Sequence, residues 1–289
     1  MEADLSSGTV LGSYRVIQKL DNTSTFLAIN TSTKKEVKIQ QLNKGSFRYT
    51  LEKGEIEVIS RANNKNIISP IEVLEDSTNT YIVQEHHKGI NMESYVNNSK
   101  LKESKVKEII QDLVNAYQTL YSNSILHYNI NPKSVFVIGK EKKVIKLGNI
   151  GIISKNIDKL YIAPEILNEN TEYNCLCDVW AIGAVIYYML HGCAPYEINE
   201  LKRGKCFIRP NVTKNCYDFL YSCLQHDPEK RMTFESMRQH PFLTEIEAHE
   251  ASQKTTTEDY YEFSSKFSKL PKSKSKTMKF IKGIIQNKE

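Results

Sequence analysis

A short stretch near the middle of the chain constrains the fold more than any other. Residues 127–134 form a polar loop with one proline, and residues 135–137 continue as a short apolar strand. A charged turn leads to a second apolar strand, residues 144–147, and a tight turn follows at Gly151. Loop, strand, turn, strand and tight turn follow one another within a single segment, and the rest of the chain must be compatible with it.

This segment resembles the catalytic loop and the metal-binding turn of the eukaryotic protein kinases, where the family has H-R-D-x-K-P-x-N and then D-F-G. The loop aligns on His127 and Pro132, and the turn aligns on Gly151. The family's base, its catalytic lysine and its two metal ligands, the Asn and then the Asp, are replaced in that order by Asn129, Asn131, Ser134 and Asn149. This chain therefore has the frame of the family's site, but different side chains at the positions that perform the chemistry.

The resemblance covers about residues 13–243, and it is most specific in the large lobe, where further motifs match. Residues 161–167 match A-P-E, residues 178–183 match D-V-W-S-x-G, and residues 224–233 and 240–242 match the closing D-P-x-x-R and H-P-F signatures. The resemblance implies a buried ion pair between Glu165 and Arg231 and a bond from Asp178 to the catalytic-loop backbone. Residues 161–196 look most like the calcium/calmodulin-dependent kinase group.

The activation segment, residues 149–165, is short. Activation-loop phosphorylation in the family docks a phosphate onto the arginine of H-R-D, and that arginine is Tyr128 here. We therefore expect that this switch is absent.

The small lobe is predicted to consist of strands at residues 13–20, 25–29 and 35–39, with a helix over residues 51–59. Lys38 matches the family's V-A-I-K lysine, and Glu55 matches the helix glutamate that pairs with it. The turn at residues 21–24 has no glycine where the family has a glycine-rich phosphate loop. Glu36 is predicted above the adenine position and Phe136 below it, which leaves little room for a purine.

The hinge is predicted at residues 85–89, where Glu85 and His87 are the candidate nucleotide contacts, with Gln84 as the gatekeeper. Residues 103–123 carry an apolar stripe at helical spacing, which predicts an amphipathic helix under the catalytic loop. The expected fold is α+β and bilobed, with a small, mainly antiparallel β lobe plus one helix and a large, mainly helical lobe. The expected boundaries are 1–12 for an N-terminal extension, 13–84 for the small lobe, 85–89 for the hinge, 90–243 for the large lobe and 244–289 for a basic C-terminal tail.

The charge distribution and the cysteines limit which partners and which cellular compartment we expect. Residues 266–288 carry eight Lys and no acidic residue, so residues 1–265 have a net charge of −2 and the positive charge belongs to the tail. The six cysteines lie between Cys175 and Cys223 without a C-x-x-C pair, which favours buried thiols in a reducing compartment. We expect a cytoplasmic protein with protein partners and no nucleic acid.

Two tail segments differ in composition. Residues 255–262 are acidic and aromatic, and residues 276–286 could form a short basic amphipathic helix. That helix could stay solvated or dock on the large lobe of its own chain, which we favour, or bind calmodulin or another acidic partner, or meet an anionic membrane.

The side chains at this site are poorly suited to phosphoryl transfer. Asn129 cannot accept a proton, and Asn149 and Ser134 are neutral, whereas Mg²⁺ prefers carboxylates and phosphates. We therefore expect a pseudokinase: no enzyme, no metal site and no cofactor, acting as a protein-binding scaffold, allosteric regulator or structural component. The alternative is a weak or atypical ATP-dependent Ser/Thr protein kinase that uses ATP and Mg²⁺.

Overall fold

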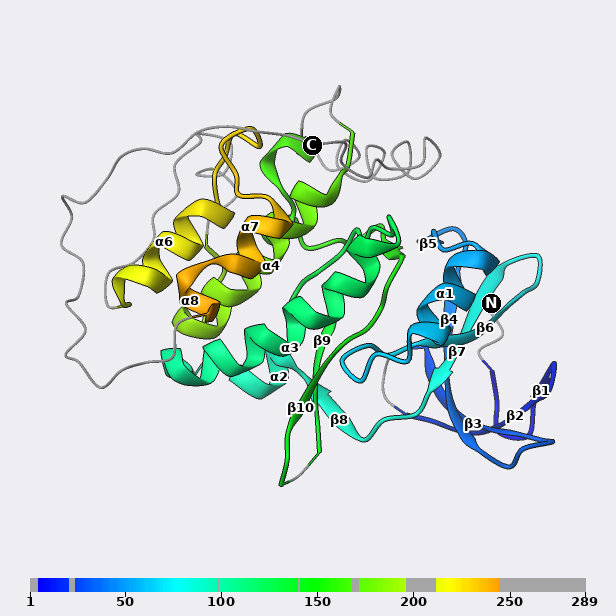
Figure 1. Ribbon diagram of the computed structural model, residues 1–289. Coiled ribbons are helices and arrows are strands. Elements are labelled where there is room, and N and C mark those ends of the chain that lie inside the picture. The colour runs from blue at the N-terminus through cyan, green and yellow to red at the C-terminus, as the bar shows by residue number, and fades with distance from the viewer. Residues whose placement is uncertain are drawn as a thin grey trace.

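The computed structural model describes residues 5–20, 24–97, 99–139, 141–167, 172–195 and 212–244. It has two lobes (Figure 1), a β-rich lobe with one helix and a helical lobe, with a small three-stranded sheet beside the connection between them. The bilobed α+β fold predicted from the sequence is confirmed.

The small lobe is built on a six-stranded antiparallel sheet in the order β1-β2-β3-β4-β7-β6. Its strands are β1 (Val10–Leu11), β2 (Tyr14–Lys19), β3 (Thr25–Asn30), β4 (Glu36–Asn43), β7 (Asn79–Glu85) and β6 (Pro70–Glu75). Alternating burial along β2 and β4 puts one face of the sheet on a core. The one helix among the described residues of this lobe, α1 (Lys53–Ala62), contacts β6.

The large lobe is arranged around α4 (Cys175–His191), in which every residue is buried. Asn174 caps its start through its side chain, and Gly192 ends it in the left-handed conformation. The amphipathic helix α3 (Glu103–Ser122) packs beside it with the predicted apolar stripe buried. Within the described residues this lobe also contains α2 (Met92–Val96), α6 (Lys214–Cys223), α7 (Phe234–Gln239), α8 (Pro241–Thr244) and the 3-10 turns η1 (Lys159–Tyr161) and η2 (Pro164–Leu167).

Two small sheets position the central segment. Strands β8 (Gly89–Asn91), β9 (Val135–Ile138) and β10 (Val144–Leu147) form an antiparallel sheet in which β9 lies in the middle. Strand β11 (Ile152–Ser154), directly after Gly151, pairs with β5 (Phe47–Tyr49) of the small lobe. The segment after the tight turn is therefore fastened to the other lobe.

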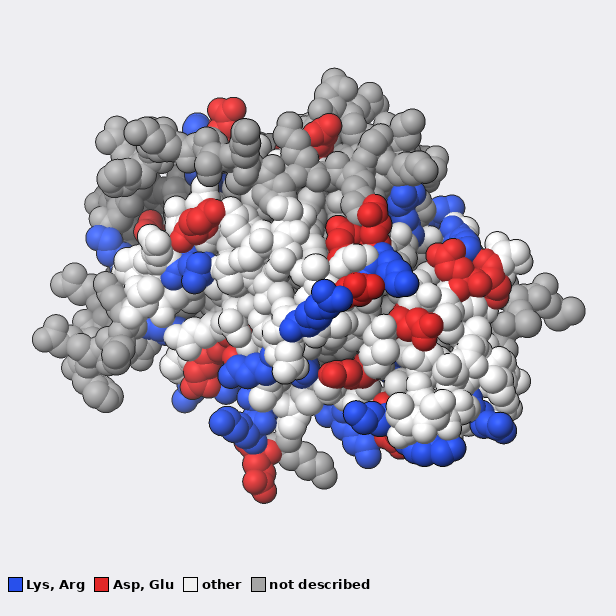
Figure 2. Space-filling view, turned by 45° about the vertical axis from the view of Figure 1, so that its right-hand side comes forward, with Lys and Arg blue, Asp and Glu red and all other residues white. Residues whose placement is uncertain are grey.

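One face of the described part of the molecule shows how the surface charges are distributed. On the face drawn in Figure 2, acidic and basic side chains are interspersed over both lobes. Among the described helices none is long and apolar enough to cross a membrane.

Candidate active site

The catalytic-loop frame is held by one buried carboxylate on α4. Asp178 is fully buried, and its two oxygens accept hydrogen bonds from the backbone N–H groups of His127 (2.9 Å) and Tyr128 (3.2 Å). The hydroxyls of Tyr117 (3.0 Å) and Tyr173 (2.6 Å) donate to the same carboxylate. Burial raises the pKa of Asp178 to about 6, although the hydrogen bonds act in the opposite direction. The bond from Asp178 to the loop backbone agrees with the sequence-based expectation.

His127 ties this loop to the strand that precedes the tight turn. Its Nε2 donates to the carbonyl of Gly148 at 2.9 Å, and its Nδ1 accepts from the backbone N–H of Asn129 at 3.3 Å. Full burial lowers the pKa of the imidazole to about 4. His127 is therefore a neutral structural connector at pH 7.

The two asparagines at the positions of the family's base and catalytic lysine are bonded to each other. The Asn131 amide donates to the Asn129 side-chain oxygen at 2.7 Å and to its carbonyl at 3.0 Å. The Asn129 amide donates to the carbonyl of Ile152 at 3.2 Å, which reaches the start of the activation segment. Both amides thus stabilise the loop in its folded shape, and neither oxygen can take a proton from an alcohol at neutral pH.

The two positions that align with the metal ligands are also neutral and engaged. The buried Ser134 hydroxyl accepts from the backbone N–H of Asn131 (3.0 Å) and donates to its carbonyl (2.9 Å). The Asn149 amide donates to the carbonyl of Lys133 at 3.4 Å, which leaves its oxygen as the remaining acceptor. Asn149 has φ of 57°, a conformation that asparagine tolerates better than most residues.

The residues present do not fit a protein-held Mg²⁺. Mg²⁺ seeks carboxylate and phosphate oxygens in octahedral geometry, and the aligned positions offer an amide and an already bonded hydroxyl. Among the described residues no group of three His, Cys, Asp or Glu side chains could hold a metal ion.

The nucleotide side of the cleft keeps its lysine. Lys38 on β4 places its ammonium 5.4 Å from the centroid of the Phe136 ring, so a cation lies above the predicted purine floor. Glu36 begins the same strand and is exposed. The Glu55 carboxylate accepts from the backbone N–H of Glu52 at 2.8 Å and so closes a capping box at the start of α1. The pairing of Lys38 with Glu55 stays a prediction.

The hinge residues Glu85 and His87 form a small charge cluster with Lys146. Glu85 contacts Nε2 of His87 at 2.9 Å and the ammonium of Lys146 at 3.9 Å. Partial burial is the largest cause lowering the pKa of His87, and the charge of Lys146 acts in the same direction. The glycine-free turn at residues 21–24 lies mostly outside the described residues, as do the tail segments at 255–262 and 276–286.

An aromatic contact anchors the catalytic loop, and an ion pair anchors the end of the activation segment. The rings of Tyr128 and Tyr173 are 4.9 Å apart, so the residue that replaces the family's arginine packs into the core. The expected buried pair is present, with Arg231 bonded to both oxygens of Glu165 at 2.6 and 2.8 Å. The sequence did not reveal Tyr117 and Tyr173 as partners of Asp178, because the first reads only as part of an apolar stripe and the second lies between motifs.

Comparison with known proteins agrees with this geometry. A protein-family model described as "Protein kinase domain" matches residues 19–243. The chain belongs to the protein kinase domain family. A solved structure of the Rad53 kinase domain superimposes on this kinase domain with a TM-score of 0.64 at 22% identity, covering 83% of this chain and 93% of that one. That likeness supports the fold.

The curated relatives of this kinase domain are named as kinases. "Serine/threonine-protein kinase ULK3" of Homo sapiens is 28% identical over 260 residues, 83% of this chain and 53% of that protein. "Serine/threonine-protein kinase atg1" of Dictyostelium discoideum is 28% identical over 212 residues, 65% of this chain and 31% of that protein. The chain thus spans about half the length, or less, of these relatives.

These names correct one expectation from the sequence. The expectation that the chain is not an enzyme is wrong, because the chain has a protein kinase domain and the relatives that it matches are named as serine/threonine-protein kinases. Its physical basis, the four neutral replacements, describes how the site differs from the family and does not establish loss of activity. The closer likeness to the calcium/calmodulin-dependent group stays a prediction.

Proposed function

We propose that this chain is an ATP-dependent serine/threonine protein kinase domain whose transfer site is atypical and slow. Its observed support is the intact frame around Asp178, which holds the catalytic loop in position, together with Lys38, whose ammonium lies 5.4 Å from the centroid of the Phe136 ring. Phosphoryl transfer depends mainly on positioning and charge neutralisation. A frame that positions the loop therefore supports slow transfer even when the side chains on it are neutral.

Each residue then has a defined task. The nucleotide, when bound, supplies the phosphoryl group that is transferred. Lys38 carries the positive charge that faces its phosphates, and Asn129 orients the acceptor hydroxyl through a hydrogen bond. Because an amide cannot remove the proton, the rate is expected to be about 10²–10⁴ times lower than with a positioned base.

Transfer of radiolabelled phosphate from ATP to serine and threonine peptides tests this proposal. We expect slow label incorporation that Lys38→Met abolishes. Lys35→Met is the matched control because Lys35 is exposed just before the same strand, and it should leave the rate unchanged. Equal incorporation by the unaltered chain and by Lys38→Met would overturn the proposal.

Nucleotide binding gives a second, independent readout. A ligand at 100 times its Kd adds about 2.7 kcal/mol to the free energy of unfolding, so ATP at saturating concentration should raise the melting temperature by a few degrees. Since the protein offers no carboxylate for Mg²⁺ at the aligned positions, we expect this shift to depend little on added Mg²⁺. Absence of any shift at millimolar ATP would contradict nucleotide binding at Lys38.

A further inference from the structure

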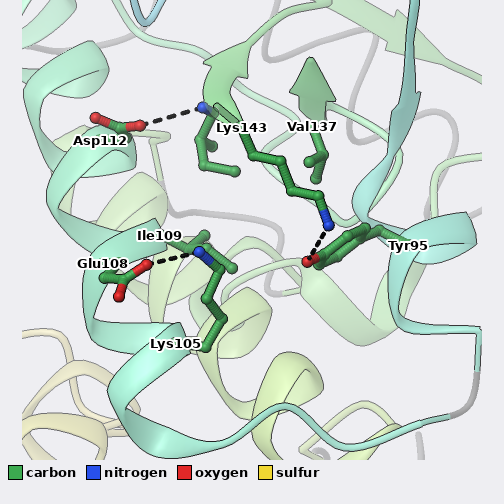
Figure 3. Close-up of a pocket in the computed structure, with 8 residues that line it drawn as sticks. Tyr95, Lys105, Glu108, Ile109, Asp112, Val137 and Lys143 are labelled. Atoms are coloured by element: carbon green, nitrogen blue, oxygen red, sulfur yellow. Dashed lines mark hydrogen bonds and ion pairs between the residues drawn. The ribbon is translucent and has the colours of Figure 1, made fainter. Parts of the chain in front are cut away.

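A pocket on the large lobe lies outside the catalytic loop and has no part in the proposed chemistry. It opens between α2, α3 and the hairpin of β9 and β10 (Figure 3). Its lining residues are Tyr95, Lys105, Glu108, Ile109, Asp112, Val137, Lys143 and Ile145. We refer to it as the α3 pocket.

The floor of the α3 pocket is apolar and suited to a single side chain. Ile109, Val137 and Ile145 are at most 5% exposed and form the buried surface. The ring of Tyr95 stands at one side (Figure 3). The space outside the protein atoms amounts to about 310 Å³ only when the solvent at its mouth is counted, so the pocket is a shallow depression. A flat ring can lie across such a depression.

The rim of the α3 pocket favours an acidic occupant. The two carboxylates are already engaged, since Glu108 bonds to Lys105 at 2.6 Å and Asp112 accepts from the backbone N–H of Ile145 at 3.1 Å. Lys143 contacts a neutral phenol, with its ammonium 3.1 Å from the Tyr95 oxygen and 4.6 Å from the ring centroid. Residues 100–112 and 141–145 together carry six Lys and four acidic residues. The site thus combines a shallow apolar floor with a cation that contacts a neutral phenol and no carboxylate there.

We propose that the α3 pocket binds residues 258–263 of the same chain, Glu-Asp-Tyr-Tyr-Glu-Phe. This segment has three carboxylates, three aromatic rings and no basic residue. One tyrosine ring enters over the apolar floor, and the flanking carboxylates pair with Lys143 and the rim. The basic segment at 276–286 is disfavoured there, because its lysines would repel Lys143.

The position of the chain end supports binding within one molecule. The last described helix, α8, contacts α3, and the carbonyl of Leu243 accepts from the Gln111 amide at 3.5 Å. Gln111 lies next to Asp112, so the tail leaves the described fold beside the helix that lines the pocket. The 14 residues from Thr244 to Glu258 can span up to about 46 Å, while α3, with 20 residues, is about 30 Å long.

Tethering also decides between the chain's own segment and a second copy. A flexible linker of this length has a root-mean-square extension of about 20 Å, which gives an effective concentration in the millimolar range. A small pocket with millimolar affinity would therefore be substantially filled by its own tail, whereas a second copy at micromolar concentration would leave it empty.

Photo-crosslinking in the full chain tests this proposal. p-Benzoylphenylalanine placed at Tyr260, and in a second preparation at Tyr261, should give crosslinks to the peptides that contain Tyr95, Ile109 or Lys143. Lys143→Glu should reduce the crosslink yield at least fivefold. Lys142→Glu is the matched control, since Lys142 is the exposed neighbour that does not line the pocket, and it should keep the yield.

Charge reversal and isotope mixing make the result decisive. Glu258→Lys with Asp259→Lys should restore the crosslink in Lys143→Glu, which loss through misfolding would not allow. In a mixture of ¹⁵N-labelled and unlabelled chains, crosslinked peptide pairs should be of one isotope only. Crosslinks elsewhere, no crosslinks, or mixed-isotope pairs from a second copy would each overturn the proposal.

Discussion

The asparagines of the catalytic loop have two roles that a substitution can separate. Asn129 and Asn131 stabilise the loop by bonding to each other, and they occupy the positions that decide proton transfer. A carboxylate at 129 would lose the bond to the carbonyl of Ile152, at a cost of about 1–3 kcal/mol in the free energy of unfolding. The same carboxylate could accept a proton, so stability and rate should change in opposite directions.

The first prediction therefore concerns restored acidity. Asn129→Asp combined with Asn149→Asp should raise the rate of phosphate transfer per folded molecule by about 10²-fold or more, because it supplies a base and an anionic metal ligand. Steady-state transfer from radiolabelled ATP measures this. Asn156→Asp is the control, since it adds a negative charge at an exposed position of the activation segment, and it should have no such effect. An unchanged rate in the double variant would show that another group limits transfer.

The second prediction follows from the depressed pKa of His127. In the folded chain this pKa is about 4, whereas a solvent-exposed histidine has its ordinary pKa of 6.5. The unfolded chain therefore binds more protons than the folded chain between pH 4 and 6.5. The contribution of neutral His127 to the free energy of unfolding is fully present above pH 6.5 and is lost as the pH falls toward 4. By pH 5 the loss is about 2 kcal/mol.

Urea unfolding at pH 7.5 and pH 5 measures that loss. His127→Gln can still donate to Gly148 but does not titrate, so its stability should fall by about 2 kcal/mol less than that of the unaltered chain over this interval. Asp178, whose raised pKa of about 6 gives the opposite slope between pH 3.8 and 6, is present in both proteins and cancels in the comparison. Equal losses would mean that His127 is protonated in the folded state.

At the scale of elements, the sequence predicted what periodicity and motifs determine. The ends of α3 and of the strands β2 to β4 fall within a few residues of the predicted limits. The reason is that buried apolar residues recur with the period of a helix or a strand along these segments. The pairing of β5 with β11 joins segments about 100 residues apart, and no local sequence pattern predicts it. The hydrogen bonds of the four site residues to one another and to nearby backbone carbonyls could not be predicted either, since they depend on loop conformation.

The third prediction tests the turn that leads into that pairing. Gly151 has φ of 71°, and a Cβ there would lie 2.8 Å from the side chains of Leu51 and Thr50. Gly151→Ala should therefore lower the free energy of unfolding by about 2 kcal/mol or more. Gly54→Ala is the control, because Gly54 lies in α1 with no atom near its Cβ position, and it should raise stability by about 0.5 kcal/mol. Thermal or urea unfolding distinguishes the two; a neutral Gly151→Ala would contradict the close approach at the turn.

At the scale of the whole molecule, the two lobes share a core and a polar junction. Ile59 of α1 and Ile150 beside the tight turn belong to one buried apolar cluster that continues into the large lobe. The polar junction is centred on Asn66, which is fully buried between α1 and β6. Its amide donates to the carbonyl of Ile145 at 2.8 Å, its side-chain oxygen accepts from Asn115 at 2.7 Å, and its carbonyl accepts from the backbone N–H of Leu147 at 2.7 Å.

The fourth prediction is that this junction couples unfolding of the small lobe to that of the large lobe. Asn66→Ala leaves the carbonyl of Ile145 without its donor in a buried place, which should cost about 2–3 kcal/mol. Asn115→Ala removes only the bond at the exposed end, where water can replace the amide, and should cost about 1 kcal/mol or less. Hydrogen exchange should then rise in β2 to β7 of Asn66→Ala while α3 and α4 keep their protection, since the small lobe has the smaller core. If both variants lost the same stability and exchange rose equally in both lobes, the junction would be one contact among many and the lobes would be joined chiefly by their shared apolar core.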